Sequence, residues 1–456
     1  MKKLLIIATL AAVGMGACSK DDGVSAPEDL RKYVQVTIPE NAASGETRTS
    51  VDGTTTSWVA GDRVAVSLYN GSTTEVCEFT ADRTGATTTF SGSVPVGSYT
   101  CAAAHYPFCA ATFDAVNKTF THTWGDAYCS TDLAAYDFMF STVYETPFVV
   151  DETTTVLPIA LTFRPLMARI GMKLALGANE TPKYVTFTTD DNVLPTAGTV
   201  NADGTFSASA LTNSLTVETD RKEFTVGLLP VGVASKMSVH VTTTDGMTYS
   251  DKSFQLAGLK RNTHYTMNVP CRTKRFMLTV PDGVNSKYGT GTYKNNEFYS
   301  VDPATDPTGI FKDWYFYRAE LKNTTNTARG DKLKGKNRIQ LQVALGGNNS
   351  NNGAFVTAPI QCDGTKTVTV SFTAATNRAI SANYWIGVTD NGPITSDWLR
   401  DINKISPHAE GLIPRSDNVS HSHTFTVTNG QRIMVKVSNT LGEHHLEFAD
   451  FTYTVE

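Results

Sequence analysis

One cysteine near the N-terminus stands in a setting that suits covalent lipid attachment. Cys18 follows Met15-Gly16-Ala17, and this tetrapeptide resembles a bacterial lipobox. In such a motif the thiol is diacylated before cleavage, and the new amino group is acylated afterwards. Several acyl chains hold a protein stably on a membrane, whereas a single chain does not. We predict lipidation at Cys18; an ordinary signal peptide followed by an incidental cysteine is the alternative.

The residues before and after Cys18 have the organisation of an export signal and a linker. Lys2 and Lys3 precede an apolar run over residues 4–17, which is shorter than the roughly 20 residues of a membrane helix. The acidic stretch 19–22 resembles a tag that directs some lipoproteins to the outer face of the outer membrane, although a solvated linker has the same composition. We therefore predict a signal peptide over 1–17, an acidic linker over 18–29 and a lipid-anchored protein exposed on the cell surface.

Aromatic residues beside polar ones in the last third of the chain indicate a carbohydrate site. Sugars place their C–H faces on aromatic rings, while nearby polar side chains bind the hydroxyls. Trp314 and Tyr317 form one candidate pair, with Tyr315 between them as a third member. Asp397, Trp398 and Arg400 form a second group, in a long stretch with little strand pattern. Burial in a sandwich core is the alternative for both tryptophans.

Other patterns give no indication of a metal, a cofactor or a catalytic centre. The pairs His421 with His423 and His444 with His445 are better explained as surface residues than as zinc ligands. Calcium needs six to eight oxygen ligands, which the aspartates of the stretch 302–307 do not approach. The sequence contains no nucleophile elbow and no HExxH motif. We predict a protein that is not an enzyme and that needs no metal or cofactor.

The composition limits the class of protein. The 456 residues include 39 Lys+Arg and 44 Asp+Glu, and only 18% of all residues are charged. Binding of nucleic acid needs clustered basic residues, so this acidic chain is not expected to bind it. Six cysteines besides Cys18 remain, four of them between 77 and 129, so one or two disulfides are possible there after export. Their connectivity is left open.

The body of the chain has the period-two alternation of half-buried strands. Residues 33–38, Tyr-Val-Gln-Val-Thr-Ile, alternate apolar and polar side chains. Similar runs occur at 64–69, 157–163, 183–188, 223–229, 237–242, 276–280, 338–344, 367–372, 423–427, 432–437 and 446–455. Dipeptides such as Asn70-Gly71 and Asp203-Gly204 supply the turns between them. These features predict an all-β chain of sandwiches, with 397–404 as the best candidate for a helix.

A series of short motifs resembles one known family in its order and spacing. The motifs are Thr47-Arg48-Thr49-Ser50, Trp58-Val59-Ala60-Gly61-Asp62-Arg63, Tyr106-Pro107, Asp137-Phe138-Met139, Leu161-Thr162-Phe163-Arg164-Pro165 and Leu259-Lys260-Arg261-Asn262-Thr263. Together they resemble the fimbrillin-like pilins and adhesins related to type V pili. The resemblance implies two consecutive fimbrillin-type (transthyretin-like) β-sandwiches, which we place at 30–156 and 157–271.

The same resemblance implies a mechanism of assembly. In the pilin branch an Arg-specific protease cuts near the start of the first domain, and the first strand leaves together with the lipid. The groove left behind accepts a strand from another fimbrial subunit. Arg48 lies in a polar stretch suited to cleavage, and 33–38 is the strand that would leave. The alternative is that Arg48 is an ordinary loop arginine and the strand stays.

Residues 276–456 extend beyond the two-domain pattern and resemble a jelly-roll, carbohydrate-binding-like β-sandwich. A C-terminal end folded into such a module offers no free donor strand. We therefore expect an adhesin at a pilus tip, or an accessory fimbrial subunit, with a glycan or protein on host or neighbouring cells as its ligand. A lipoprotein that binds polysaccharide without polymerising is one alternative, and a structural pilus subunit is another.

Overall fold

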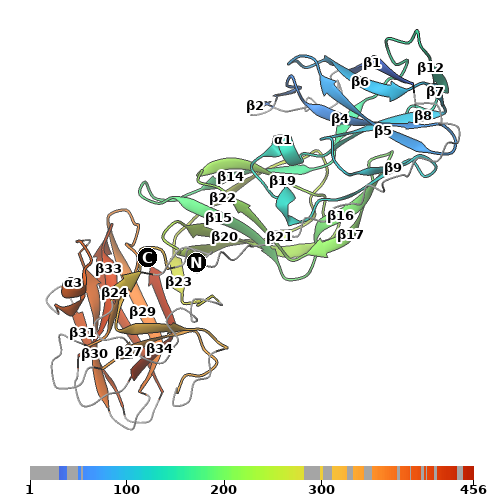
Figure 1. The fold of residues 1–456 in the computed structure, drawn as a ribbon. Coiled ribbons are helices and arrows are strands. Elements are labelled where there is room, and N and C mark those ends of the chain that lie inside the picture. The colour runs from blue at the N-terminus through green and yellow to red at the C-terminus, as the bar shows by residue number, and fades with distance from the viewer. Residues whose placement is uncertain are drawn as a thin grey trace, which may run out of the picture.

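Strands make up most of this chain, as the sequence predicts. The computed structural model describes residues 30–38, 50–52, 55–281, 298–300, 311–325, 332–343, 352–376, 381–390, 392–401, 405–406, 408–414, 418–438 and 445–456. In Figure 1 the described strands form three β-rich regions that follow one another along the molecule, coloured blue, green and orange in chain order. The all-β fold class is thereby confirmed.

The first region is built on a seven-stranded sheet, which we call the N-terminal sheet. Its order is β1 (Arg31–Ile38), β6 (Thr88–Pro95), β5 (Thr74–Ala81), β4 (Arg63–Tyr69), β8 (Cys101–Tyr106), β11 (Met139–Ser141) and β13 (Phe163–Pro165). Two small pairs accompany it, β12 (Phe148–Val150) with β7 (Gly97–Tyr99) and β2 (Ser50–Asp52) with β3 (Thr55–Ser57). Trp58 lies at the centre of its core, in edge-to-face contact with Phe90, Tyr106 and Phe163.

The middle region combines two smaller sheets with half of a long one. One sheet is β17 (Phe206–Thr212), β16 (Leu194–Asn201), β10 (Thr119–Thr123) and β9 (Thr112–Asp114); the other is β19 (Glu223–Leu228), β14 (Ala168–Leu174) and β22 (His264–Val269). Because β9 and β10 precede residue 157 and β16 follows it, strand pairing crosses the boundary between the first two expected domains. The short helices η1 (Asp126–Tyr128) and α1 (Leu133–Tyr136) lie between β10 and β11 in the chain.

A ten-stranded sheet, which we call the long sheet, runs from the middle region into the C-terminal region. Its order is β18 (Ser214–Glu218), β15 (Pro182–Thr189), β20 (Ser235–Thr243), β21 (Thr248–Leu256), β23 (Lys274–Met277), β34 (His445–Val455), β27 (Arg338–Gln342) and β26 (Ala319–Lys322). β29 (Thr365–Thr376) pairs with β34 and with β32 (Val419–Thr428). The C-terminal strand β34 therefore has three neighbours, β23, β27 and β29.

A second sheet completes the C-terminal sandwich. Its order is β24 (Phe298–Ser300), β25 (Tyr315–Tyr317), β28 (Ala354–Val356), β33 (Arg432–Val437), β30 (Ala382–Thr389) and β31 (His408–Ile413). Aliphatic and aromatic side chains from this sheet and from the long sheet form one continuous core. The helix α3 (Ser396–Arg400) overlaps the stretch 397–404 for which a helix is predicted, but it begins one residue earlier and ends at Arg400.

An ionic cluster is buried where the long sheet passes from β21 to β23. The ammonium group of Lys274 lies 2.7 Å from Glu180 and 3.0 Å from Asp245, and its side chain is only 1% exposed. The hydroxyl of Tyr249 donates a hydrogen bond of 2.6 Å to Glu180. Lys274 also donates to the carbonyl of Gln361, which belongs to the C-terminal region. The cluster therefore fixes the C-terminal region to the middle region with hydrogen-bonded charges.

The predicted strands agree with the structure except at two places. At 157–163 the alternation predicts burial correctly, since Leu157, Ile159 and Leu161 face the core, but only Phe163 belongs to a strand. Pro158 interrupts this run and has no N–H to contribute to a ladder. At 276–280 the strand ends at Met277.

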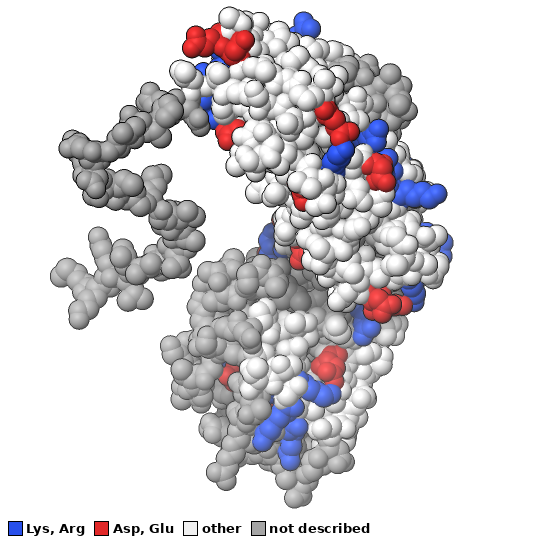
Figure 2. All heavy atoms as spheres, turned by 90° about the vertical axis from the view of Figure 1, so that its right-hand side faces the viewer, with Lys and Arg blue, Asp and Glu red and all other residues white. Residues whose placement is uncertain are grey.

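Charges on the surface are sparse and mixed. On the face drawn in Figure 2, acidic and basic side chains are interspersed and separated by broad uncharged areas. Among the described residues, no helix is long and apolar enough to span a membrane.

Candidate functional site

Strand β1 fills a position at one edge of the N-terminal sheet with its apolar side chains turned inward. Val34, Val36 and Ile38 are completely buried, whereas Tyr33 on the opposite face is 68% exposed. The period-two alternation of the sequence places the three aliphatic side chains on one face. Each such burial stabilises the fold by about 1.5–3 kcal/mol, so the strand is held largely by its side chains.

Backbone hydrogen bonds hold β1 on both of its sides. Along one side it pairs with β6 over its full length, from Arg31 opposite Pro95 to Ile38 opposite Thr88. On the other side the amide of Gln35 donates to the carbonyl of Thr155 (2.9 Å), and the amide of Leu157 donates to the carbonyl of Gln35 (2.8 Å). We call the space between β6 and residues 155–157 the β1 slot. Loss of β1 would leave unpaired backbone groups on both walls of this slot.

The shortest polar side-chain contacts of β1 lie at its start and are exposed. Arg31 forms an ion pair of 3.0 Å with Glu75 and donates to the carbonyl of Ser93 (2.9 Å). Lys32 donates to the carbonyl of Glu152 (2.6 Å). Exposed pairs of this kind contribute about 0–1 kcal/mol each. The buried side chains and the ladder therefore account for most of the binding of β1.

Two predicted modification sites, Cys18 for lipidation and Arg48 for cleavage, lie outside the described residues. Both remain predictions. The described chain resumes at β2 (Ser50–Asp52), two residues after Arg48.

The first pair of predicted ligand contacts is wrong. Trp314 is completely buried between the two C-terminal sheets, with its ring centre 5.0 Å from that of Phe276 and 5.5 Å from that of Phe311. Tyr317 is also completely buried, in a smaller cluster that includes Leu399 of α3. Neither ring has a face in solvent on which a sugar could stack.

The second group lies on α3 at the outer face of the second C-terminal sheet. The hydroxyl of Thr395 accepts a hydrogen bond of 3.2 Å from the amide of Trp398, which caps the helix. The Trp398 ring is partly buried against the cluster that contains Tyr317, and Asp397 is exposed. The backbone of Arg400 ends α3, but its side chain lies outside the described residues.

Beside Trp398, two further aromatic residues pack against this cluster: Tyr315, which the sequence groups with Trp314 and Tyr317, and Trp385, which it assigns to no site. Tyr315 and Trp385 are partly buried against the same cluster. On β30 it is Tyr384 that points into the core between the two sheets, whereas Trp385 lies on the outer face. The three partly exposed rings form a small aromatic patch, which we call the α3 patch.

The N-terminal and middle regions carry a sequence signature that decides the family. A family profile described as Fimbrillin-like matches residues 47–283, just over half of the chain. The chain belongs to the fimbrillin-like family. This membership confirms the resemblance drawn from the short motifs, and it implies a location on the cell surface. No curated protein sequence matches the chain.

Solved structures that resemble this fimbrillin-like chain share little sequence with it. A candidate cell adhesion protein from Bacteroides uniformis is 16% identical with a TM-score of 0.36, and the match covers 53% of this chain and 93% of that one. The tip fimbrial protein Mfa3 from Porphyromonas gingivalis is 11% identical with a TM-score of 0.28, covering 55% and 96%. The CBM22-1 xylan-binding domain of Paenibacillus barcinonensis Xyn10C is 12% identical with a TM-score of 0.22, covering 32% and 86%.

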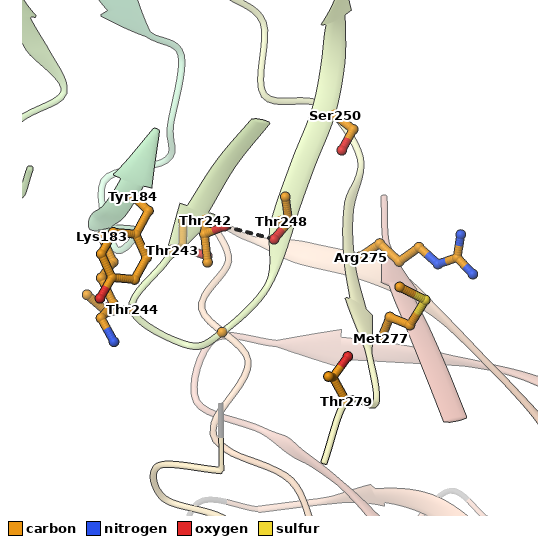
Figure 3. Close-up of a pocket in the computed structure, with 11 residues that line it drawn as sticks. Lys183, Tyr184, Thr242, Thr243, Thr244, Thr248, Ser250, Arg275, Met277 and Thr279 are labelled. Carbon is orange, nitrogen blue, oxygen red and sulfur yellow. Dashed lines mark hydrogen bonds between the residues drawn. The ribbon is translucent and has the colours of Figure 1, made fainter. Parts of the chain in front are cut away.

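Sequence reasoning missed one hollow in the fimbrillin-like chain, a groove of about 490 Å³ in the long sheet. Tyr184, Thr248 and Arg275 line it, and Figure 3 shows them on three different strands. Tyr184 and Arg275 lie more than 90 positions apart along the chain, and each of the three residues stands in an ordinary strand pattern. Only the pairing of β15, β20, β21 and β23 brings them together.

The thiols and histidines of the fimbrillin-like chain occupy structural positions. None of the six described cysteines forms a disulfide, so neither of the possible bridges is present, and five of the six are buried. The Nε2 atom of His423 lies 2.8 Å from the hydroxyl of Tyr384, and burial lowers the pKa of both His421 and His423. Among the described residues, no three metal-ligating side chains converge.

Proposed function

We propose that this protein is a surface adhesion lipoprotein of a fimbrial system, which accepts a donor strand after cleavage at Arg48. The occupied β1 slot carries this proposal. It holds a strand of eight residues through three buried aliphatic side chains and through backbone pairs on both sides. A strand of the same alternation from another subunit would satisfy the same groups.

The energetics of the slot support exchange rather than simple loss of β1. Removal of β1 would abolish the burial of Val34, Val36 and Ile38, and this loss would lower the free energy of unfolding by about 5–9 kcal/mol in total. A domain is typically stable by only about 5–15 kcal/mol, so an empty slot leaves the N-terminal region close to unfolding. A donated strand restores this free energy, which gives a strong drive for assembly.

The proposed position in the fimbria is the tip or an accessory site. β34 has hydrogen-bonded neighbours on both sides, so this strand cannot be donated without opening the C-terminal sandwich. The C-terminal region would instead present the ligand-binding surface, with a glycan or a protein on host or neighbouring cells as the ligand. A lipid at Cys18 would anchor the precursor in the outer membrane until cleavage releases it.

The first residue of the protein recovered from the native cell surface tests the proposal. Intact mass or Edman sequencing should show a start at Thr49 if the first strand is removed. A start at acylated Cys18 would mean that β1 stays, and the protein would then be a lipid-anchored binding protein that does not polymerise. An Arg48→Ala variant should retain Cys18 at its start even where the wild type does not.

A peptide experiment tests the slot itself. Protein that begins at Thr49 should bind a synthetic peptide of residues 30–38, with a rise in its melting temperature. The same peptide with Val36→Asp should not bind, because it would bury a charge. Equal stabilisation by both peptides, or none by either, would rule out a side-chain-specific slot.

A further inference from the structure

The groove in the long sheet has the size of a ligand site. Its volume of about 490 Å³ lies within the range of roughly 300–1,000 Å³ that is typical of ligand pockets. One row of paired residues crosses it: Tyr184 lies opposite Thr242, Thr242 opposite Thr248 and Thr248 opposite Arg275. None of these four side chains is buried, and buried residues alternate with them along the strands. The row therefore belongs to the solvent face of the sheet.

Several hydroxyl groups line the groove. They belong to Tyr184, Thr242, Thr244, Thr248, Ser250 and Thr279. The hydroxyls of Thr242 and Thr248 lie 3.0 Å apart in a mutual hydrogen bond, drawn as a dashed line in Figure 3. A hydroxyl both donates and accepts, so an array of this kind matches the hydroxyls of a sugar better than it matches an acceptor-only ligand.

The charged side chains among the described residues that line the groove are positive. They are Lys183 and Arg275, and no aspartate or glutamate is part of this described lining. Within the described part of the chain, the guanidinium of Arg275 makes no hydrogen bond or ion pair. Arginine pairs with a carboxylate through two parallel hydrogen bonds. The groove is therefore complementary to a ligand that carries carboxylates.

Apolar surface is present beside these polar groups. The ammonium of Lys183 lies 5.0 Å from the centre of the Tyr184 ring, which holds the ring and the charge together. Met277 is 59% exposed on the same side as Arg275. The C–H faces of sugar rings can contact both side chains while their substituents reach the hydroxyls and the cations.

The row of residues continues beyond the groove toward the C-terminal region. Arg275 lies opposite Thr454, Thr454 opposite Thr369 and Thr369 opposite Thr424. The hydroxyls of Thr369 and Thr424 lie 3.3 Å apart. An extended surface of hydroxyls suits a chain of several sugars better than a single sugar.

We propose that this groove binds an acidic polysaccharide, with a uronate carboxylate on Arg275 and sugar rings against Tyr184 and Met277. The site lies on the joint between the middle and C-terminal regions and uses none of the residues of the α3 patch. It does not depend on strand exchange, so a protein that keeps β1 would bind the same ligand.

Calorimetric titration of the full mature protein with hexamers of galacturonic acid, hyaluronan and heparin tests the site. We expect at least one hexamer to bind, and its methyl-esterified form, which keeps the rings and loses the carboxylate charges, to bind far more weakly. Arg275→Gln should weaken binding about tenfold to hundredfold, since one charge-assisted pair is lost. Tyr184→Ala should weaken it as well, while Arg221→Gln, which removes an exposed charge elsewhere, should have no effect.

Three results would overturn the proposal. These are no binding of any of the three hexamers, equal binding by wild type and Arg275→Gln, and equal binding of the esterified sugar. Tighter binding of a glutamate-rich peptide than of every hexamer would assign the groove to a protein partner instead. Melting curves of each variant exclude unfolding as the cause of a loss, and an Arg48→Ala variant that binds as wild type separates this site from strand exchange.

Discussion

At the scale of single residues, burial of a titratable side chain links this fold to pH. His105 is completely buried, its ring stacks on Phe138 at 5.7 Å, and its Nε2 atom lies 3.3 Å from the carbonyl of Cys109. Burial lowers the pKa of His105 to about 4. The folded protein therefore prefers the neutral imidazole, whereas the unfolded chain accepts a proton at an ordinary pKa.

Acid should destabilise the protein through His105. The unfolded chain binds the proton as the pH falls below the ordinary value of 6.5, and the folded protein does so only near the lowered pKa of about 4. The contribution of neutral His105 to the free energy of unfolding is therefore fully present above pH 6.5, and it is lost progressively as the pH falls to 4. We expect a loss of about 2 kcal/mol between pH 7 and pH 5 from this residue. Urea unfolding at the two pH values measures it.

A His105→Phe variant isolates the effect, because it keeps a buried ring and removes the titration. The difference in stability between pH 7 and pH 5 should be smaller in this variant than in the wild type. Exposed His408→Asn serves as the matched control and should behave as wild type. An undiminished acid sensitivity in His105→Phe would assign the effect to other groups, such as His122, whose pKa burial also lowers.

The sequence shows which aromatic residues share a face of a strand, but it does not show which segments pack against that face. In Trp314-Tyr315-Phe316-Tyr317, the alternation places Trp314 and Phe316 on one face of β25 and the two tyrosines on the other. The first face lies against the long sheet, and the second is covered by the cluster around Leu399. A pattern of period two shows which residues share a face, but it does not show what covers that face.

At the scale of elements, alternation and turn dipeptides were enough to predict most strands. β1, β4, β15, β33 and β34 lie where the sequence places them. The strand predicted over 157–163 was wrong, because side chains can alternate between buried and exposed without the backbone pairing in a sheet. Pro158 has no N–H to donate and prevents regular pairing there. Partners of each strand were not predictable, since register depends on contacts between distant segments.

Gly92 is the element-scale test of the β1 slot. It lies on β6 between Val34 of β1 and Phe79 of β5, and the Phe79 ring covers it. A Cβ atom at this position would lie 2.5 Å from the carbonyl of Glu78 and 2.6 Å from the Phe79 ring. Gly92→Ala should therefore lower the free energy of unfolding by about 1–3 kcal/mol.

The same substitution should loosen β1, because β6 is the strand that pairs with it. Hydrogen exchange of the amides in 31–38 should be faster in Gly92→Ala than in the wild type. Gly232→Ala is the control, since open space surrounds that position and the stability should be nearly unchanged. Equal exchange in the two variants would show that β6 tolerates the added methyl group.

At the scale of the whole molecule, the long sheet makes the middle and C-terminal regions continuous. Its joint depends on Lys274, Glu180 and Asp245, which are far apart in the chain. Nothing in their local sequence distinguishes them from surface charges, so the joint was not predictable. The strand that fills the β1 slot was predictable, because residues 33–38 alternate apolar and polar side chains, whereas its exchange after cleavage at Arg48 is implied by the family resemblance alone.

Breaking the buried cluster should weaken this joint strongly. Lys274→Met leaves two buried carboxylates without their cation, and we expect a loss of about 3–5 kcal/mol. The triple variant Lys274→Met, Glu180→Gln, Asp245→Asn should recover much of that loss, because no buried charge is left unpaired. Exposed Lys236→Met is the control. Guanidinium unfolding of the four proteins measures the differences; a loss as small as the control's would mean that the cluster contributes little.

The continuous sheet also has a mechanical consequence. β21 and β23 are joined by the pairs Thr248 with Arg275 and Tyr249 with Lys274, and β23 is joined to β34 by four more pairs. If a ligand binds the C-terminal region as proposed, a pull on that ligand cannot rotate this region freely, since bending the joint breaks this ladder and the charges beneath it. The two regions would then move as one body, and tension on the ligand would become torque on the middle region.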